Sequence, residues 1–254
     1  MERRVIIKSN MGIESIERVT APPWGPKTQV YREHMARYNF AKNYIAHRKV
    51  LDVACGSGFG SFAMAEVAEE VVGLDLDEQA IRFAKEHYQE ENLHYETGSA
   101  TALPFGDAEF GAVVSFETIE HLLDQEKFLE EVRRVLEPSG IFLVSTPDRE
   151  TIPYFFVNPT EYNNPFHVKE LSKRELSNLL AKRFHILEWF GQGLFTGQKN
   201  GNRQALSGMK KYFTWLPESW RLKLKSFLLG AGNTSEIFEL HDKRSKYLIA
   251  VCRT

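Results

Sequence analysis

The sequence predicts an α/β fold in which a seven-stranded, mostly parallel sheet carries helices on both faces. Between residues 48 and 148, short apolar runs alternate with amphipathic stretches, which is the order typical of parallel strands joined by helices. The runs AVVSF and IFLV are apolar throughout, as is typical of strands covered on both sides. A glycine-rich turn, CGSGFG, directly follows the first of the runs.

Seven apolar runs are long enough to be strands, five of them before residue 148 and two after residue 183. We expect the last two strands to form an antiparallel hairpin beside the parallel strands. The predicted strands are residues 49–55, 70–76, 93–98, 110–117, 141–147, 184–192 and 245–253.

Helical periodicity and capping signals predict the helices between these strands. The stretch that starts at Asp77 has an acidic first turn, which favours a helix start. Ser172 is followed by Glu175 three residues later, which is the pattern of a capping box. The predicted helices are residues 28–47, 61–69, 77–91, 125–136 and 172–182.

Length and composition predict a single domain, residues 1–254. The chain has 254 residues and 43% hydrophobic residues, enough to form a core. Within this domain we expect a cofactor-binding core at residues 28–148, an acceptor-side loop at 149–170 and a helical cap insertion at 193–235. A loop as long as 149–170 usually has a function in a compact domain.

Charge and cysteine content narrow the function classes. The net charge of −2 gives no global basic field for nucleic acid. Cys55 and Cys252 are too few for a disulfide framework, which favours a reducing, cytoplasmic setting.

The N-terminal apolar run is too short for a signal peptide, and no stretch approaches the roughly 18 apolar residues of a membrane span. Residues 199–225 are locally basic and aromatic. They would contact a lipid-linked, phosphorylated or nucleic-acid acceptor. Alternatively, their aromatic residues would cover the active site or form a homodimer contact, with the charges on a solvated face.

The glycine turn and the acids around it indicate the kind of ligand. No Lys followed by Ser or Thr comes after the last glycine, so the turn is not a phosphate-binding loop of the Walker type. Gly56, Gly58 and Gly60 give G-x-G-x-G rather than the dinucleotide pattern G-x-G-x-x-G. Asp52, inside the preceding strand, would repel a diphosphate and favours a positively charged ligand. Asp75 ends the next strand at a distance that suits a carboxylate bonded to ribose hydroxyls. A positively charged ligand with a ribose and no phosphate indicates S-adenosylmethionine.

Four motifs in order resemble those of class I S-adenosylmethionine-dependent methyltransferases, which have a Rossmann-like fold. They are VLDVACGSGFG, VVGLDLDEQAIRFAKEH, GSATALPFGDAEFGAVVSFETIEHL and FLEEVRRVLEPSGIFLVSTPD, and they cover about residues 48 to 148. The resemblance implies a cofactor site at the carboxyl ends of the strands. Its members would be Asp52, Ala54, Gly56, Gly58, Asp75, Leu76, Ser99, Ala100 and Phe116.

The resemblance also implies a role for each of these positions. Gly56 and Gly58 would let the backbone approach the cofactor closely, and Phe116 would line the cofactor pocket. Asp52 and the backbone from Ala54 to Gly56 would hold the methionine end of the cofactor. Asp75 would bind the ribose, and Leu76 would pack on the adenine. The family often has an acid at the position of Ser99, so adenine contact would depend on this hydroxyl and on the amide of Ala100.

The segment ETIEHL places Glu117, Glu120 and His121 after the fourth strand, and His167 follows in NNPFHVKE. This set resembles the metal-binding E-x-x-E-H and distal histidine of small-RNA 2′-O-methyltransferases, and the E-x-x-E-H of ubiquinone-pathway O-methyltransferases. The segment also occurs in family members in which its histidine bonds a neighbouring loop. We expect no bound metal and assign the four residues a catalytic role, with His121 as a base or acceptor-orienting group. A structural role for His121 stays open.

Two further segments, REHMARYNFA and NPFHVKELSKRELSNLL, are similar to methyltransferases of bacterial surface-glycan biosynthesis. We therefore expect methyl transfer to a hydroxyl of a sugar or another small polar acceptor. The alternatives are a nucleic-acid or quinone-like acceptor, or a non-catalytic protein that binds the cofactor for a partner enzyme. Arg37 would face the cofactor or lie on the surface, and Gln192 would bond the acceptor or cap the sixth strand.

Overall fold

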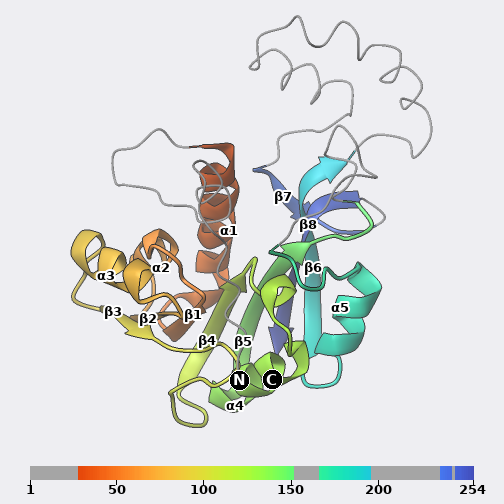
Figure 1. Ribbon diagram of the computed structural model, residues 1–254. Coiled ribbons are helices and arrows are strands. Elements are labelled where there is room, and N and C mark those ends of the chain that lie inside the picture. Colours follow the sequence, from red (N-terminus) through yellow and green to blue (C-terminus); the bar gives the residue numbers. More distant parts are fainter. Residues whose placement is uncertain (1–27, 152–165, 196–234, 242–243) are drawn as a thin grey trace, which may run out of the picture.

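The computed structural model describes residues 28–151, 166–195, 235–241 and 244–254, and these form a single sheet flanked by helices (Figure 1). The sheet has eight strands in the order β3-β2-β1-β4-β5-β8-β6-β7. The strands are β1 (Lys49–Val53), β2 (Glu70–Asp75), β3 (Leu93–Thr97), β4 (Phe110–Phe116), β5 (Leu136–Pro147), β6 (His185–Phe195), β7 (Ile237–Glu239) and β8 (Arg244–Arg253).

Strands β1 to β5 pair in parallel, which confirms the predicted α/β class. β8 lies between β5 and β6 and is antiparallel to both, so the predicted final hairpin is present with β8 on its inner side. The sheet has one strand more than the seven predicted. The additional strand, β7, has three residues and pairs with β6 in the described sheet. Three residues are too few to form an apolar run that predicts a strand.

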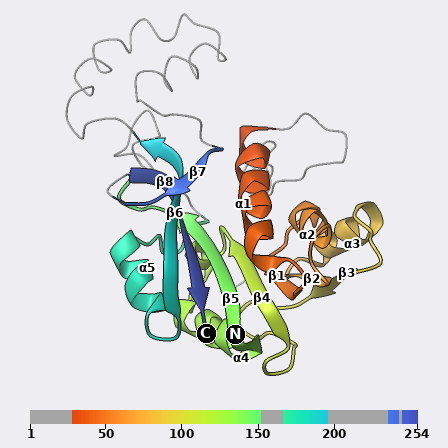
Figure 2. The same cartoon turned by 180° about the vertical axis from the view of Figure 1, so that it is seen from behind.

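The helices cover both faces of the sheet, as the continuous apolar strands predict (Figure 2). Alternate residues of one strand point to opposite faces: Val50 packs on the side of α1 to α3, and Leu51 packs on the side of α4 and α5. The helices are α1 (Gln29–Ile45), α2 (Phe59–Ala65), α3 (Glu78–His87), α4 (Gln125–Val135) and α5 (Lys173–Leu180), and a 3₁₀ turn, η1, covers Ile119–His121. No helix in the described part of the chain has the length and apolar character that a membrane crossing needs.

A buried junction fixes α1 and α2 to the carboxyl end of β1. The carboxylate of Asp52 accepts hydrogen bonds from the Ser61 hydroxyl at 2.6 Å and from the Tyr38 hydroxyl at 3.4 Å. Gly60 lies against the Tyr38 ring, where an added Cβ would stand 2.1 Å from Cζ. The third glycine of the turn is therefore required by the close approach of α1.

The predicted cap, residues 193–235, lies outside the described residues except at its two ends. The same is true of the basic segment 199–225 and of most of the acceptor-side loop 149–170. The surface, homodimer and domain-division predictions for these segments stay predictions.

Candidate active site

The glycine turn leaves the carboxyl end of β1 with an unusual backbone. Gly56 and Gly58 have φ values of 57° and 87°, and Ala54 has a φ of 61° although it carries a Cβ. Such strain in a residue other than glycine is most common at functional sites. A Cβ built at Gly56 meets nothing within 4 Å, so the turn is open to a ligand there.

Asp75, at the end of β2, ties the glycine turn to the neighbouring strand. Its two carboxylate oxygens accept hydrogen bonds from the backbone N–H groups of Gly56 at 2.8 Å and Asp77 at 2.9 Å. Leu76 follows with 74% of its surface exposed, an apolar side chain presented to solvent at the rim of the turn. This arrangement suits a flat aromatic ring beside a polar sugar, as expected for the cofactor.

The segment after β3 reaches the same rim. The N–H of Gly98 donates to the Asp75 carbonyl at 3.0 Å, and the next residue is Ser99. The Ser99 hydroxyl oxygen accepts from the Thr101 N–H at 3.2 Å and lies 3.0 Å from the Thr101 hydroxyl. Ala100, between these two residues, is half-buried. The structure thus brings Ser99 and Ala100 to the Asp75 side of the turn, and their contact with adenine stays a prediction.

Asp52 lies behind the turn rather than on its open side. It is wholly buried, with both oxygens engaged by Ser61 and Tyr38. Burial, together with the charge of Asp75, raises the pKa of Asp52 to about 7 against the effect of its two hydrogen bonds. Phe116 packs edge-on against the Tyr38 ring at 5.3 Å and belongs to the same support. The predicted contacts of Asp52 and Phe116 with the cofactor stay predictions.

The sequence left open whether Arg37 faces the cofactor or lies on the surface. In the structure Arg37 is wholly buried. Its Nη1 donates to the Gln192 side chain, and its guanidinium lies 4.7 Å above the ring of Tyr247. Within the described residues, its Nε and Nη2 have no hydrogen-bond partner. A buried cation with unsatisfied N–H groups is costly unless a ligand completes it, and a planar guanidinium matches a carboxylate.

Gln192 uses both of its polar side-chain atoms to hold α1. Its Oε1 accepts from Arg37, and its Nε2 donates to the Glu33 carbonyl at 2.9 Å. The sequence left Gln192 as an acceptor contact or a strand cap. The structure instead shows it as a bridge between β6 and α1.

Two glutamates follow β4 in very different settings. Glu117 has a φ of 56°, and its Oε1 accepts from the Ser145 hydroxyl at 2.6 Å. Glu120 is wholly buried; its Oε2 accepts from the Thr146 hydroxyl at 3.0 Å. Its Oε1 has no hydrogen-bond partner among the residues described. Burial and then the charge of Glu117 raise the pKa of Glu120 well above its ordinary value.

His121 and His167 meet beside Glu120. The rings of the two histidines pack edge-on with centroids 4.9 Å apart. One candidate ligand atom each from Glu120, His121 and His167 lies within 4.8 Å of the others, and Glu117 is not in this group. The structure therefore joins three of the four predicted catalytic residues in one cluster.

The protonation of the His121 ring follows from its partner. His121 Nδ1 lies 2.9 Å from the Phe166 carbonyl oxygen, which can only accept. Nδ1 thus carries a proton, and in the neutral ring Nε2 holds the lone pair. This Nε2 stands 3.9 Å from Glu120 Oε1. The two atoms are too far apart for a direct hydrogen bond, and 34% of the His121 side chain is exposed.

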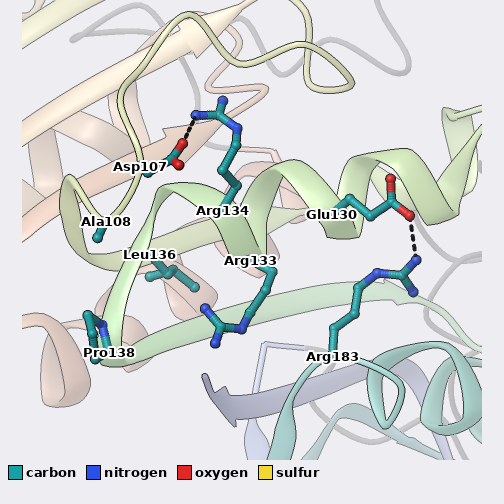
Figure 3. A pocket seen from close by; sticks show the side chains of 8 residues that line it. All are labelled: Asp107, Ala108, Glu130, Arg133, Arg134, Leu136, Pro138 and Arg183. Carbon is teal, nitrogen blue, oxygen red and sulfur yellow. Dashed lines mark hydrogen bonds and ion pairs between the residues drawn. The ribbon is translucent and has the colours of Figure 1, made fainter.

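A separate pocket of about 350 Å³ is lined by residues of α4, of the start of β5 and of the segments before β4 and β6 (Figure 3). In it Arg134 pairs with Asp107 at 2.9 Å and Arg183 pairs with Glu130 at 2.8 Å. Asp107 precedes β4 and Arg183 precedes β6, so the pocket adjoins the amino ends of the strands. It is remote in the fold from the glycine turn, which lies at the carboxyl ends.

Comparisons with known proteins agree with this geometry. Residues 51–144 match the family model described as a methyltransferase domain. A probable S-adenosylmethionine-dependent methyltransferase of Mycolicibacterium smegmatis is 39% identical over 161 residues, which are 63% of this chain and 61% of that protein. A probable S-adenosylmethionine-dependent methyltransferase of Mycobacterium tuberculosis is 36% identical over 189 residues, which are 74% of this chain and 67% of that protein.

A solved structure is similar in fold. It is a chain from the complex between the Haloferax volcanii Trm112 methyltransferase activator and the putative methyltransferase. The match has a TM-score of 0.63 at 17% identity and covers 87% of this chain and 89% of that chain. At this identity the likeness concerns the fold alone.

The raised pKa of Asp52 predicts a specific pH dependence of stability. Between about pH 4 and pH 7 the folded chain holds a proton on Asp52 that the unfolded chain releases, so the free energy of unfolding falls as the pH rises through this window. Asp52→Asn cannot ionise. Urea denaturation should therefore show a smaller fall for the variant, by up to about 4 kcal/mol. Parallel pH curves for the two proteins would mean that Asp52 titrates normally in the folded state.

Proposed function

Because the chain belongs to the S-adenosylmethionine-dependent methyltransferase family, we propose that it transfers a methyl group from this cofactor to a hydroxyl of a sugar or another small polar acceptor. The observation that carries the acceptor side is the partly exposed ring of His121, whose Nδ1 is held by the Phe166 carbonyl and whose Nε2 stands 3.9 Å from Glu120 Oε1. It lies just past the carboxyl end of β4, where parallel sheets of this type bind their ligands.

The residues around the glycine turn fit the cofactor. The unsatisfied N–H groups of buried Arg37 would hold its carboxylate, and the open backbone at Gly56 would let it approach. Asp75 would accept hydrogen bonds from the ribose, and exposed Leu76 would pack on the adenine. When bound, S-adenosylmethionine supplies a methyl group that its positive sulfur already activates. The protein has to align the acceptor and exclude water.

His121 would act as the base for the acceptor hydroxyl. The Phe166 carbonyl fixes its tautomer, so the Nε2 lone pair can accept the hydroxyl proton while the oxygen is methylated. The sugar as acceptor is supported by the segments similar to glycan-biosynthesis methyltransferases. We further propose that residues 149–170 and 193–235 cover this acceptor side.

A metal-assisted version of the same reaction is a second candidate, favoured by the convergence of Glu120, His121 and His167. Mixed carboxylate and imidazole donors suit a divalent cation. Such an ion would lower the pKa of the acceptor hydroxyl and orient it.

Arg37→Met tests the cofactor site. Methionine keeps an unbranched side chain at this position and removes every N–H group of the guanidinium. S-adenosylmethionine should therefore bind roughly 10- to 150-fold more weakly, the equivalent of about 1.5–3 kcal/mol. Isothermal calorimetry measures this directly. Arg82→Met changes an arginine whose side chain is 65% exposed and should leave the affinity unchanged. Equal affinity of Arg37→Met and wild type would exclude Arg37 from the cofactor site.

His121→Ala tests the base. Turnover should fall by roughly 100- to 10,000-fold, because no other lone pair of the cluster is held in the same position. The assay is a screen of sugar, quinone-like and nucleic-acid acceptors with methyl-labelled cofactor, combined with calorimetry of cofactor binding, which should not change. The exposed His94 provides the control variant His94→Ala. Turnover of His121→Ala within about threefold of wild type would give His121 a structural role.

Chelation separates the base from the metal. We expect turnover to survive EDTA, because a positioned His121 lone pair is sufficient to accept the proton. Loss of turnover in EDTA, with cofactor binding intact and activity restored by Mg²⁺ or Mn²⁺, would establish the metal-assisted reaction instead.

A further inference from the structure

His167 forms a close pair with a residue that the sequence patterns did not single out. Its Nδ1 lies 2.5 Å from Oε1 of Glu170, three residues later. The side chains are only 10% and 12% exposed. A carboxylate this close to a ring nitrogen and this far from water makes a strong, charge-assisted hydrogen bond.

The backbone of this segment is already held without the pair. The N–H groups of Val168 and Lys169 donate to the Glu120 carbonyl at 2.9 and 3.0 Å. The Gln125 side chain donates to the Lys169 carbonyl at 3.0 Å. These bonds fix the loop to η1 independently of the pair. Enclosing both ionisable side chains costs free energy of desolvation, and the short bond to Glu170 holds the ring of His167 in one orientation.

An ionised Glu170 determines which ring nitrogen of His167 carries the proton. A carboxylate only accepts hydrogen bonds, so the proton resides on Nδ1, and the lone pair of the neutral ring is on Nε2. His121 has the same tautomer, fixed by the Phe166 carbonyl. The two edge-on rings beside Glu120 would therefore both carry an Nε2 lone pair.

We propose that Glu170 is a positioning residue for methyl transfer: it holds His167 in the Nδ1–H tautomer so that the Nε2 lone pair orients the acceptor beside His121. This inference rests on the proposed function for its catalytic consequence. The tautomer itself is a property of the folded chain and can be measured without any acceptor.

Two-bond ¹H–¹⁵N spectra of the histidine rings test the tautomer in the full-length chain, at a pH where the ring is neutral. The His167 signals are assigned by their loss in His167→Gln. Wild type should show a protonated Nδ1 and an unprotonated Nε2. Glu170→Gln keeps the side-chain oxygen acceptor and should retain this pattern, whereas Glu170→Leu should shift the ring toward the Nε2–H form.

Turnover should follow the tautomer. Glu170→Leu should lose roughly 10- to 100-fold, the range for residues that orient a functional histidine, with cofactor affinity unchanged, and Glu170→Gln should recover most of it. Glu239→Leu is the matched control, because it removes a carboxylate 2.9 Å from His241 where both side chains are about 70% exposed. It should alter neither turnover nor the His167 spectrum. Glu170→Ala replaces the leucine variant if the latter does not fold.

Three outcomes would overturn the proposal. The first is a wild-type His167 with its proton on Nε2, and the second is a tautomer that Glu170→Leu leaves unchanged. The third is a Glu170→Gln variant with the wild-type tautomer and the turnover of Glu170→Leu. If no acceptor is methylated at all, the proposed function fails by its own assay, and the spectra still decide whether Glu170 sets the His167 ring.

Discussion

The hydrogen bonds of buried Asp52 are the interaction on which the site depends most. One carboxyl group joins β1, α1 and α2 through Tyr38 and Ser61, directly beneath the glycine turn. Gly60 allows this meeting, because any side chain there would collide with the Tyr38 ring. The junction holds α1 against the sheet and thereby keeps Arg37, the neighbour of Tyr38, at the carboxyl ends of the strands. These contacts therefore hold the glycine turn in place without a ligand.

The proposed acceptor side is assembled differently, from hydrogen bonds to backbone carbonyls between distant segments. The carbonyl of Glu120 receives two N–H groups from the segment that carries His167, and the carbonyl of Phe166 receives the ring of His121. The two segments thus hold each other, one through backbone bonds and the other through the His121 ring. Because Glu120 is at once a backbone acceptor and a buried carboxyl group, a shift of η1 would displace all three members of the cluster together.

The parallel half of the fold could be predicted from the sequence, because its signals are local. Apolar runs, a glycine turn and capping residues each lie within a few positions of the structure they specify. The insertion of β8 between β5 and β6 could not be predicted in the same way, since strand order depends on contacts between residues far apart in the chain, such as Ile141 with Arg253 and His185 with Arg253. β7 has three residues and no pattern of its own.

The same distinction applies to the site. The glycines and Asp75 stand out by spacing, whereas the meeting of His167 with Glu120 and His121 depends on how a loop returns to η1. The burial of Arg37 could not be predicted from the sequence, because an arginine on a helix usually lies on the surface. Its contacts are with Gln192 and Tyr247, which lie far along the chain. Glu170 had a signal, a histidine and a carboxylate three residues apart, but such pairs are common on surfaces.

The place of β8 also affects how the chain matures on the ribosome. Synthesis proceeds from the N-terminus, so the residues of β1 to β5 have all been made when residue 147 has emerged. β6 is made next, but in the described sheet its neighbours are β8 and β7, which are both synthesised later. Gln192 cannot reach Arg37 in its final geometry until β8 has bridged β5 and β6. The nascent chain would thus contain the glycine turn early. The support of Arg37 would be complete only when β8, the last strand, has been synthesised.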